Sequence, residues 1–127
     1  KRKDGKRMRN YATQMEAARK GIVTKELETV AKKERMTVEE LMPLVASGKV
    51  AICANKIHAC ISPEGIGSML KTKINVNLGV SRDCKDYNVE MEKVMEAVRM
   101  GAHAIMDLSS HGDTVPFRRK LPTSVRL

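Results

Sequence analysis

Two short segments of this chain carry polar side chains in patterns that could bind a small molecule. The first is segment 75–79, Asn-Val-Asn-Leu-Gly, where the alternation of a β-strand would put Asn75 and Asn77 on one face. An asparagine amide offers hydrogen-bond donors and an acceptor, which suits a polar heterocycle or a sugar hydroxyl. The same amides could satisfy the backbone of neighbouring loops instead, and the spacing alone leaves both interpretations open.

The second segment, 106–112, reads Met-Asp-Leu-Ser-Ser-His-Gly and ends another apolar run. Asp107 and His111 could bring a charged acceptor close to a side chain that titrates near neutral pH. The spacing favours a plainer interpretation, in which Asp107 caps a following helix and His111 is an exposed loop residue. Because functional groups of parallel α/β folds gather where the strands end, both segments are candidate sites.

The spacing of the three cysteines indicates no metal site. Cys53 and Cys60 are six residues apart in a C-x6-C pattern with His58 between them, which matches no common zinc motif, and Cys84 is isolated. We therefore expect buried or incidental thiols. The odd cysteine count, the absence of a signal peptide and the absence of an apolar run of about 18 residues predict a cytoplasmic protein without a membrane partner.

The net charge of +9 is concentrated at the two ends of the chain. Residues 1–9 contribute +5 and residues 118–126 contribute +4, whereas residues 10–117 are neutral. Solvated termini are the simpler interpretation, and a small basic module that binds nucleic acid is the alternative from another functional class. With two Tyr, one Phe and no Trp to stack on bases, we do not expect nucleic acid to be the partner.

Capping residues and glycines predict three helices before the first strand, over residues 13–21, 24–35 and 37–48. Thr13 and Thr37 each have a glutamate three residues later, which is the spacing of a capping box. Pro43 is expected to kink or shorten the third helix.

Short apolar runs predict three strands, over residues 50–54, 72–78 and 102–108. The connection over 55–68 contains Pro63, Gly65 and Gly67, and we expect it to be irregular. Apolar residues at helical spacing predict a helix from Tyr87 to Val98, ended by Gly101. Residues 72–108 therefore form one strand-helix-strand unit with parallel strands, a unit that builds either open sheets or closed barrels.

Several longer strings are more specific than these patterns. They are Thr-Gln-Met at 13–15, Ala-Arg-Lys-Gly-Ile-Val-Thr at 18–24, Ala-Asn at 54–55, Lys-Ile-Asn-Val-Asn-Leu-Gly-Val-Ser at 73–81 and Ala-His-Ala-Ile-Met-Asp-Leu-Ser at 102–109. Together, and with the interval between the last two, they resemble the N-terminal part of the phosphomethylpyrimidine synthases over residues 13–112.

The resemblance implies an α/β fold, namely the N-terminal portion of a (β/α)8 barrel preceded by short helices and incomplete as given. Together with the charge and capping patterns, which predict a basic flexible lead at 1–10 and a helical segment at 11–48, it assigns the first strands and helices of a partial barrel to 49–127. It further implies a radical S-adenosylmethionine carbon-carbon lyase of thiamine biosynthesis. That enzyme converts its small-molecule substrate, 5-aminoimidazole ribonucleotide, into 4-amino-5-hydroxymethyl-2-methylpyrimidine phosphate.

The resemblance also assigns substrate-binding residues. Asn77 matches a pocket position that hydrogen-bonds the nucleotide, and Met106 matches one that contacts it by packing or through its backbone. Asn55 would lie at the pocket mouth. The cofactors implied for the complete enzyme are a [4Fe-4S] cluster, S-adenosylmethionine and a divalent metal, with zinc the expected ion, and the complete enzyme is expected to be a homodimer.

Two departures from the family pattern limit these expectations. The cluster motif Cys-x2-Cys-x4-Cys and the later metal-binding histidines are absent, so we expect this segment alone to bind no cofactor and to be inactive. Two segments differ from the commonest sequence of the thiamine enzymes: Lys-Ile-His at 56–58, and the strand that carries Val76, Leu78 and Val80. The related 5-hydroxybenzimidazole synthases of anaerobic cobamide synthesis are therefore the alternative activity, and an inactive truncated barrel with exposed sheet edges is a third interpretation.

Overall fold

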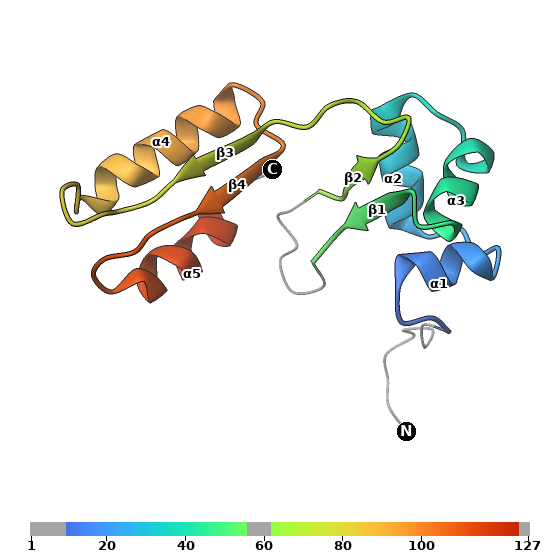
Figure 1. Cartoon of the computed structure of the whole chain (residues 1–127), viewed down its shortest axis with the longest axis horizontal. Coiled ribbons are helices and arrows are strands. Elements are labelled where there is room, and N and C mark those ends of the chain that lie inside the picture. The colour runs from blue at the N-terminus through green and yellow to red at the C-terminus, as the bar shows by residue number, and fades with distance from the viewer. Residues whose placement is uncertain (1–9, 56–61, 125–127) are drawn as a thin grey trace. The chain divides into compact units, whose positions relative to one another are not determined.

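The computed structural model describes residues 10–55 and 62–124, with side chains as far as Leu121. It divides into two compact units, one formed by the chain up to Ile52 together with Gly65–Leu70, the other by Cys53–Glu64 and the chain from Lys71 onward (Figure 1). Apart from Asn10, the predicted basic lead lies outside the described residues, as do His58 and Cys60. Within the described part of the chain, no helix is long and apolar enough to cross a membrane.

Three short helices make up most of the first unit, and all three were predicted. They are α1 (Gln14–Arg19), α2 (Lys25–Glu34) and α3 (Val38–Ala46). Each begins after a threonine whose hydroxyl accepts a hydrogen bond from a backbone N–H in the first turn. The full capping box forms at Thr37, where the Glu40 carboxylate accepts from the Thr37 N–H at 2.8 Å. Pro43 lies inside α3 without interrupting it.

The core of the first unit is formed by apolar side chains of the three helices and of the first strand: Ala18, Leu27, Val30, Ala31, Leu41, Val45 and Val50. That strand, β1 (Val50–Cys53), pairs with β2 (Glu64–Gly67) in a two-stranded sheet. Burying side chains such as Leu41 and Val30, which are completely inaccessible, is worth roughly 1.5–3 kcal/mol each. The packing of Val50 against the helices thus attaches the two-stranded sheet to them.

Strand β2 corrects the prediction that residues 55–68 are irregular. Glycine is required at two positions of this strand because neighbouring atoms leave no room for a side chain, not because the chain turns there. A Cβ on Gly65 would lie 2.5 Å from Val30 Cγ1, and a Cβ on Gly67 would lie 2.1 Å from the Lys49 carbonyl oxygen. Glycine weakens strand propensity, but here it lets the backbone approach its neighbours.

The second unit contains the predicted strand-helix-strand arrangement, followed by a further helix. Strand β3 (Asn75–Leu78) and strand β4 (Ala104–Asp107) flank helix α4 (Tyr87–Arg99), and α5 (Thr114–Ser124) follows. The strands pair in parallel, as predicted, and both are shorter than the apolar runs indicated. Helix α5 was not predicted. Its Pro116 lies in the first turn, where the missing N–H costs nothing.

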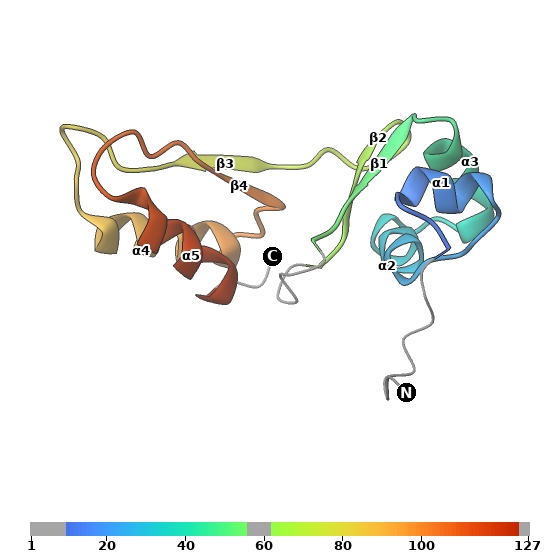
Figure 2. The same ribbon diagram turned by 90° about the horizontal axis from the view of Figure 1, so that it is seen from below.

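Both helices of this unit cover the same face of the β3–β4 sheet (Figure 2). Leu78 on β3, Val94 on α4 and Phe117 on α5 form the buried centre, with Val76 and Ile105 packed against it. Because side chains alternate along a strand, Asn77 and Met106 lie on the opposite face. The structure is therefore a mixed α/β chain with two small sheets, and the complete barrel stays a prediction.

Candidate functional site

Asn77 and Met106 face each other across the parallel β3–β4 pair. They are register partners, and Asn75 lies opposite Ala104 on the same face, two residues earlier along each strand. Asn77 is exposed, and Met106 exposes 49% of its surface. The structure thus brings together two of the three predicted substrate-binding residues, which are 29 positions apart in the chain, on the face that α4 and α5 leave open.

The two asparagines share one face of β3, as the alternation predicted. The Asn75 side-chain amide donates a hydrogen bond to Asn77 Oδ1 at 2.9 Å. This bond favours one orientation of the Asn77 side chain and takes one of the two lone pairs of Oδ1. Its Nδ2 group has no hydrogen-bond partner among the described residues, so it is left to donate to a ligand on the open face.

Asn55, the third predicted site residue, lies two residues beyond the end of β1 and is exposed. Its place at the mouth of a pocket stays a prediction.

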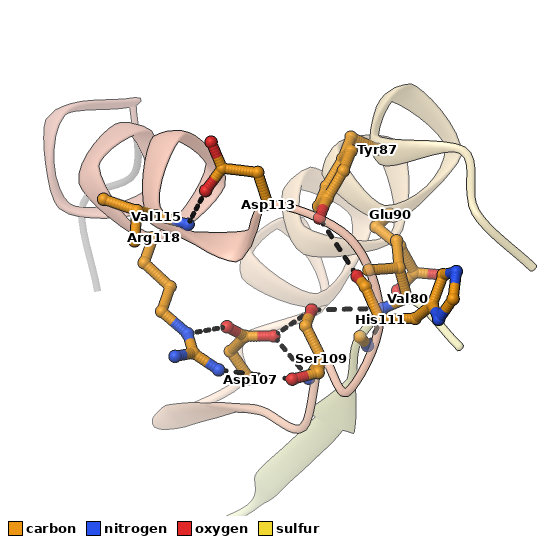
Figure 3. A network of polar contacts seen from close by, with 10 residues as sticks. Val80, Tyr87, Glu90, Asp107, Ser109, His111, Asp113, Val115 and Arg118 are labelled. Atoms are coloured by element: carbon orange, nitrogen blue, oxygen red, sulfur yellow. Dashed lines mark hydrogen bonds and ion pairs between the residues drawn. The ribbon is translucent and has the colours of Figure 1, made fainter. Parts of the chain in front are cut away.

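The helix-covered side of the strand ends holds a polar network that the sequence patterns did not indicate (Figure 3). Asp107 Oδ2 pairs with Arg118 Nε of α5 at 2.6 Å. Asp107 Oδ1 accepts from both the backbone N–H and the hydroxyl of Ser109, at 2.9 and 2.5 Å. The hydroxyl of Ser109 in turn accepts from the Val80 N–H at 3.1 Å. The network therefore runs from α5, through the end of β4, to the segment after β3.

Neither function considered for Asp107 matches its observed contacts. Its carboxylate is taken up by Ser109 and Arg118 rather than by His111. The turn before α5 is closed by Asp113, whose side chain accepts from the Val115 N–H at 3.2 Å, so Asp107 is not the helix cap. His111 is an exposed loop residue, as the plainer interpretation predicted.

The electrostatic environment of Asp107 favours its ionised form. Burial raises the pKa of its carboxyl group, but the hydrogen bonds from Ser109 and the ion pair with Arg118 together outweigh burial. The pKa of Asp107 is therefore lower than its ordinary value, and the residue serves as a fixed negative charge rather than as a proton donor near neutral pH.

Glu90 is a second residue that the sequence patterns missed. Its side chain is 1% exposed, although it belongs to α4 and is charged. It accepts from the Gly79 N–H at 2.9 Å and pairs with Lys93 Nζ at 2.6 Å. A signal was present in the sequence, because Glu90 falls three residues after Tyr87 and four before Val94, on the apolar face of the predicted helix.

Metal-ligand chemistry is not supported by the side chains that the structure describes. Within those residues, no group of three or more His, Cys, Asp or Glu side chains could hold a metal ion. Cys53 and Cys84 are free and exposed, so of the two expectations, buried or incidental thiols, burial does not hold for this pair. The arrangement can orient a small polar ligand on the open face of β3–β4.

Comparison with known proteins identifies close sequence relatives of this segment. A model of the Radical SAM ThiC family matches residues 13–127. A phosphomethylpyrimidine synthase of Clostridium novyi (strain NT) is 64% identical over 112 residues, and those of Clostridium botulinum strains Langeland and Kyoto are 62% identical over the same length. Each match covers 88% of this chain and 26% of the relative, so the chain spans about a quarter of the length of these curated relatives.

Proposed function

Because this chain belongs to the Radical SAM ThiC family, as its sequence strings predicted, we propose that it forms the substrate-holding part of a phosphomethylpyrimidine synthase. The complete enzyme would be a radical S-adenosylmethionine lyase of thiamine biosynthesis. It would convert 5-aminoimidazole ribonucleotide into 4-amino-5-hydroxymethyl-2-methylpyrimidine phosphate, acting as a cytoplasmic homodimer. The observation that carries this proposal is the 64% identity to a protein of that name over most of this chain.

The role proposed for this segment is to bind and orient the nucleotide. The open face of β3–β4 supports it, because Asn77, with its free Nδ2 group, and the exposed Met106 lie opposite each other there. Asn77 would donate a hydrogen bond to the ligand, while Met106 would pack against it with a flexible and polarisable side chain. Asn55 would contribute at the edge of the same pocket. In a complete barrel the helix-free face would line the interior.

The radical chemistry is assigned to other parts of the enzyme. The complete enzyme is proposed to draw its radical chemistry from a [4Fe-4S] cluster and S-adenosylmethionine, with a divalent metal, expected to be zinc, as a further cofactor. The described residues of this chain do not fit either group, since no suitable cluster of ligands is present among them. We therefore assign this segment no step of the radical reaction.

The test is anaerobic turnover by the complete protein that contains this chain, with reconstituted cluster, S-adenosylmethionine and 5-aminoimidazole ribonucleotide. We expect the pyrimidine phosphate as product. Release of 5-hydroxybenzimidazole would instead assign the chain to the cobamide branch. The coding sequence beyond Leu127 should also contain the Cys-x2-Cys-x4-Cys motif, and its absence from the locus and from any partner gene would refute the lyase proposal.

Nucleic acid binding is tested with the same protein. A salt-dependent mobility shift with DNA or RNA would support the alternative of a basic binding module, since neutralising phosphates releases counterions. We expect no shift at low salt.

A further inference from the structure

The segments that follow β3 and β4 stay paired beyond the ends of the strands. The Leu108 N–H donates to the Leu78 carbonyl at 2.7 Å, and the Ser110 N–H donates to the Val80 carbonyl at 3.0 Å. The contact is close, because a Cβ on Gly79 would lie 2.4 Å from the Ser109 nitrogen. The pairing therefore holds the two strand ends at a fixed separation.

Side chains, rather than backbone carbonyls, accept the donors on the β3 side of this pairing. The Gly79 N–H donates to Glu90 of α4, and the Val80 N–H donates to the Ser109 hydroxyl. Val80 is 1% exposed and Ser109 is 9% exposed, so water does not readily replace the serine. A buried N–H without a partner costs about 1–3 kcal/mol.

The Ser109 hydroxyl is held in one orientation by the groups behind it. Its proton is donated to Asp107 Oδ1, which leaves a lone pair directed at the Val80 N–H. Asp107 is itself fixed by Arg118, whose Nη2 also donates to the Ser109 carbonyl at 3.3 Å. Helix α5 therefore holds the Ser109 hydroxyl in the orientation in which it accepts from Val80.

We infer that Ser109, oriented by Asp107 and Arg118, is a positioning residue for the Asn77–Met106 pair. The inference rests on the proposed function, in which that pair contacts the nucleotide. Asn77 lies three residues before Val80 and Met106 lies three before Ser109, so the Ser109–Val80 bond closes the pairing just past the ligand-facing residues. Loss of the hydroxyl would leave the Val80 N–H without an acceptor, so that only the two backbone bonds hold the strand ends and the spacing of the two side chains is less tightly fixed.

The structural half of this inference is tested by amide hydrogen exchange in the complete protein that contains this chain. Ser109→Ala should speed exchange at the Val80 amide about tenfold, the effect of losing roughly one hydrogen bond. Ser109→Thr keeps the hydroxyl and should restore protection, and Ser110→Ala, at an exposed neighbouring serine, should leave it unchanged. Unchanged exchange in Ser109→Ala would overturn the inference.

The functional half is tested by measuring the Kd of 5-aminoimidazole ribonucleotide in the complete protein, well below its melting temperature. We expect Ser109→Ala to raise the Kd about tenfold, with Ser109→Thr and Ser110→Ala within about twofold of the wild type. A change that is only structural would lower the melting temperature and leave the Kd of the folded protein unaltered, which would overturn the positioning role. Absence of binding by the wild type would instead overturn the proposed function, and this inference with it.

Discussion

The buried carboxylate of Glu90 accepts a hydrogen bond from the N–H of Gly79, eleven residues earlier in the chain. One carboxylate oxygen of Glu90, on α4, accepts from the backbone N–H that follows β3, and the other pairs with the Lys93 ammonium group. A charged residue on the apolar side of a helix thus replaces a missing strand partner.

Replacing Glu90 should separate its hydrogen bond from its charge. Glu90→Ala leaves the Gly79 N–H without its acceptor and opens a cavity, so it should lower the free energy of unfolding by about 2–3 kcal/mol. Glu90→Gln keeps an acceptor oxygen and should cost about 1 kcal/mol or less. Glu92→Ala, at an exposed position of the same helix, should stay within about 0.5 kcal/mol of the wild type in urea unfolding. Equal effects of Glu90→Ala and Glu92→Ala would contradict this role.

Gly79 should tolerate no side chain. Its φ of +147° and the 2.4 Å approach of a Cβ to the Ser109 nitrogen both oppose Gly79→Ala. We expect a loss of about 3 kcal/mol or more in the free energy of unfolding. Gly101→Ala is the matched control in the same unit, since Gly101 also has a positive φ but a Cβ there meets nothing within 4 Å. It should cost about 1–2 kcal/mol, the penalty for the backbone conformation alone.

Asn77→Ala should weaken nucleotide binding without weakening the fold. The side chain is exposed and its amide nitrogen is free for a ligand, so its loss should raise the Kd of 5-aminoimidazole ribonucleotide about tenfold in the complete protein. Asn88→Ala removes an exposed asparagine from α4 and should leave the Kd unchanged. Isothermal titration calorimetry measures the Kd of both variants. Equal Kd values for Asn77→Ala and Asn88→Ala would show that Asn77 does not contact the nucleotide.

Asp107 should make stability depend on pH in the acid range. The pKa of its carboxyl group is lowered in the folded state by Ser109 and Arg118, against the effect of burial, so the unfolded state binds more protons as the pH falls. Its contribution is present in full above the ordinary value of about 3.9 and is lost as the pH falls below it toward the folded pKa. Asp107→Asn should flatten this part of the stability curve, measured by urea unfolding between pH 6 and about pH 2.5. Asp83→Asn, at an exposed position, should leave the slope intact.

The capping box of α3 offers a separate test in the first unit. Thr37→Ala removes the acceptor for the Glu40 N–H and should lower the protection of α3 amides by about 1 kcal/mol in hydrogen exchange. Thr29→Ala, within α2, removes only a bond to the Lys25 carbonyl and should be nearly neutral. If the α3 amides of Thr37→Ala keep their full protection, then packing of Leu41 and Val45, rather than capping, stabilises this helix.

Local signals were sufficient for most of the helices and strands. Thr13, Thr24 and Thr37 identified the starts of three helices because an N-cap acts within one turn. The apolar runs identified β1, β3 and β4, and the length of the crossover indicated parallel pairing of the last two. The alternation of Asn75 and Asn77 placed both on one face.

Features that depend on distant contacts could not be read in the same way. Strand β2 was missed because Gly65 is explained by close packing of side chains against it, including that of Val30, 35 residues away. The bond between Ser109 and Val80 spans 29 residues, and no local pattern of either residue indicates it. The resemblance implied that Asn77 and Met106 line one pocket, but their pairing depends on the register of the sheet, which neither the resemblance nor the spacing gave.

The anchoring of Asp107 by Arg118 also has a consequence for how the chain is made. A ribosome delivers β3, α4 and β4 before it delivers α5, because synthesis runs from the N-terminus. The nascent strands can pair while Arg118 is still inside the exit tunnel, but the Asp107 carboxylate then lacks its counter-charge. The ends of β3 and β4 therefore gain the Asp107–Arg118 contact, which helps to hold the Ser109 hydroxyl, only after the helix behind them has emerged.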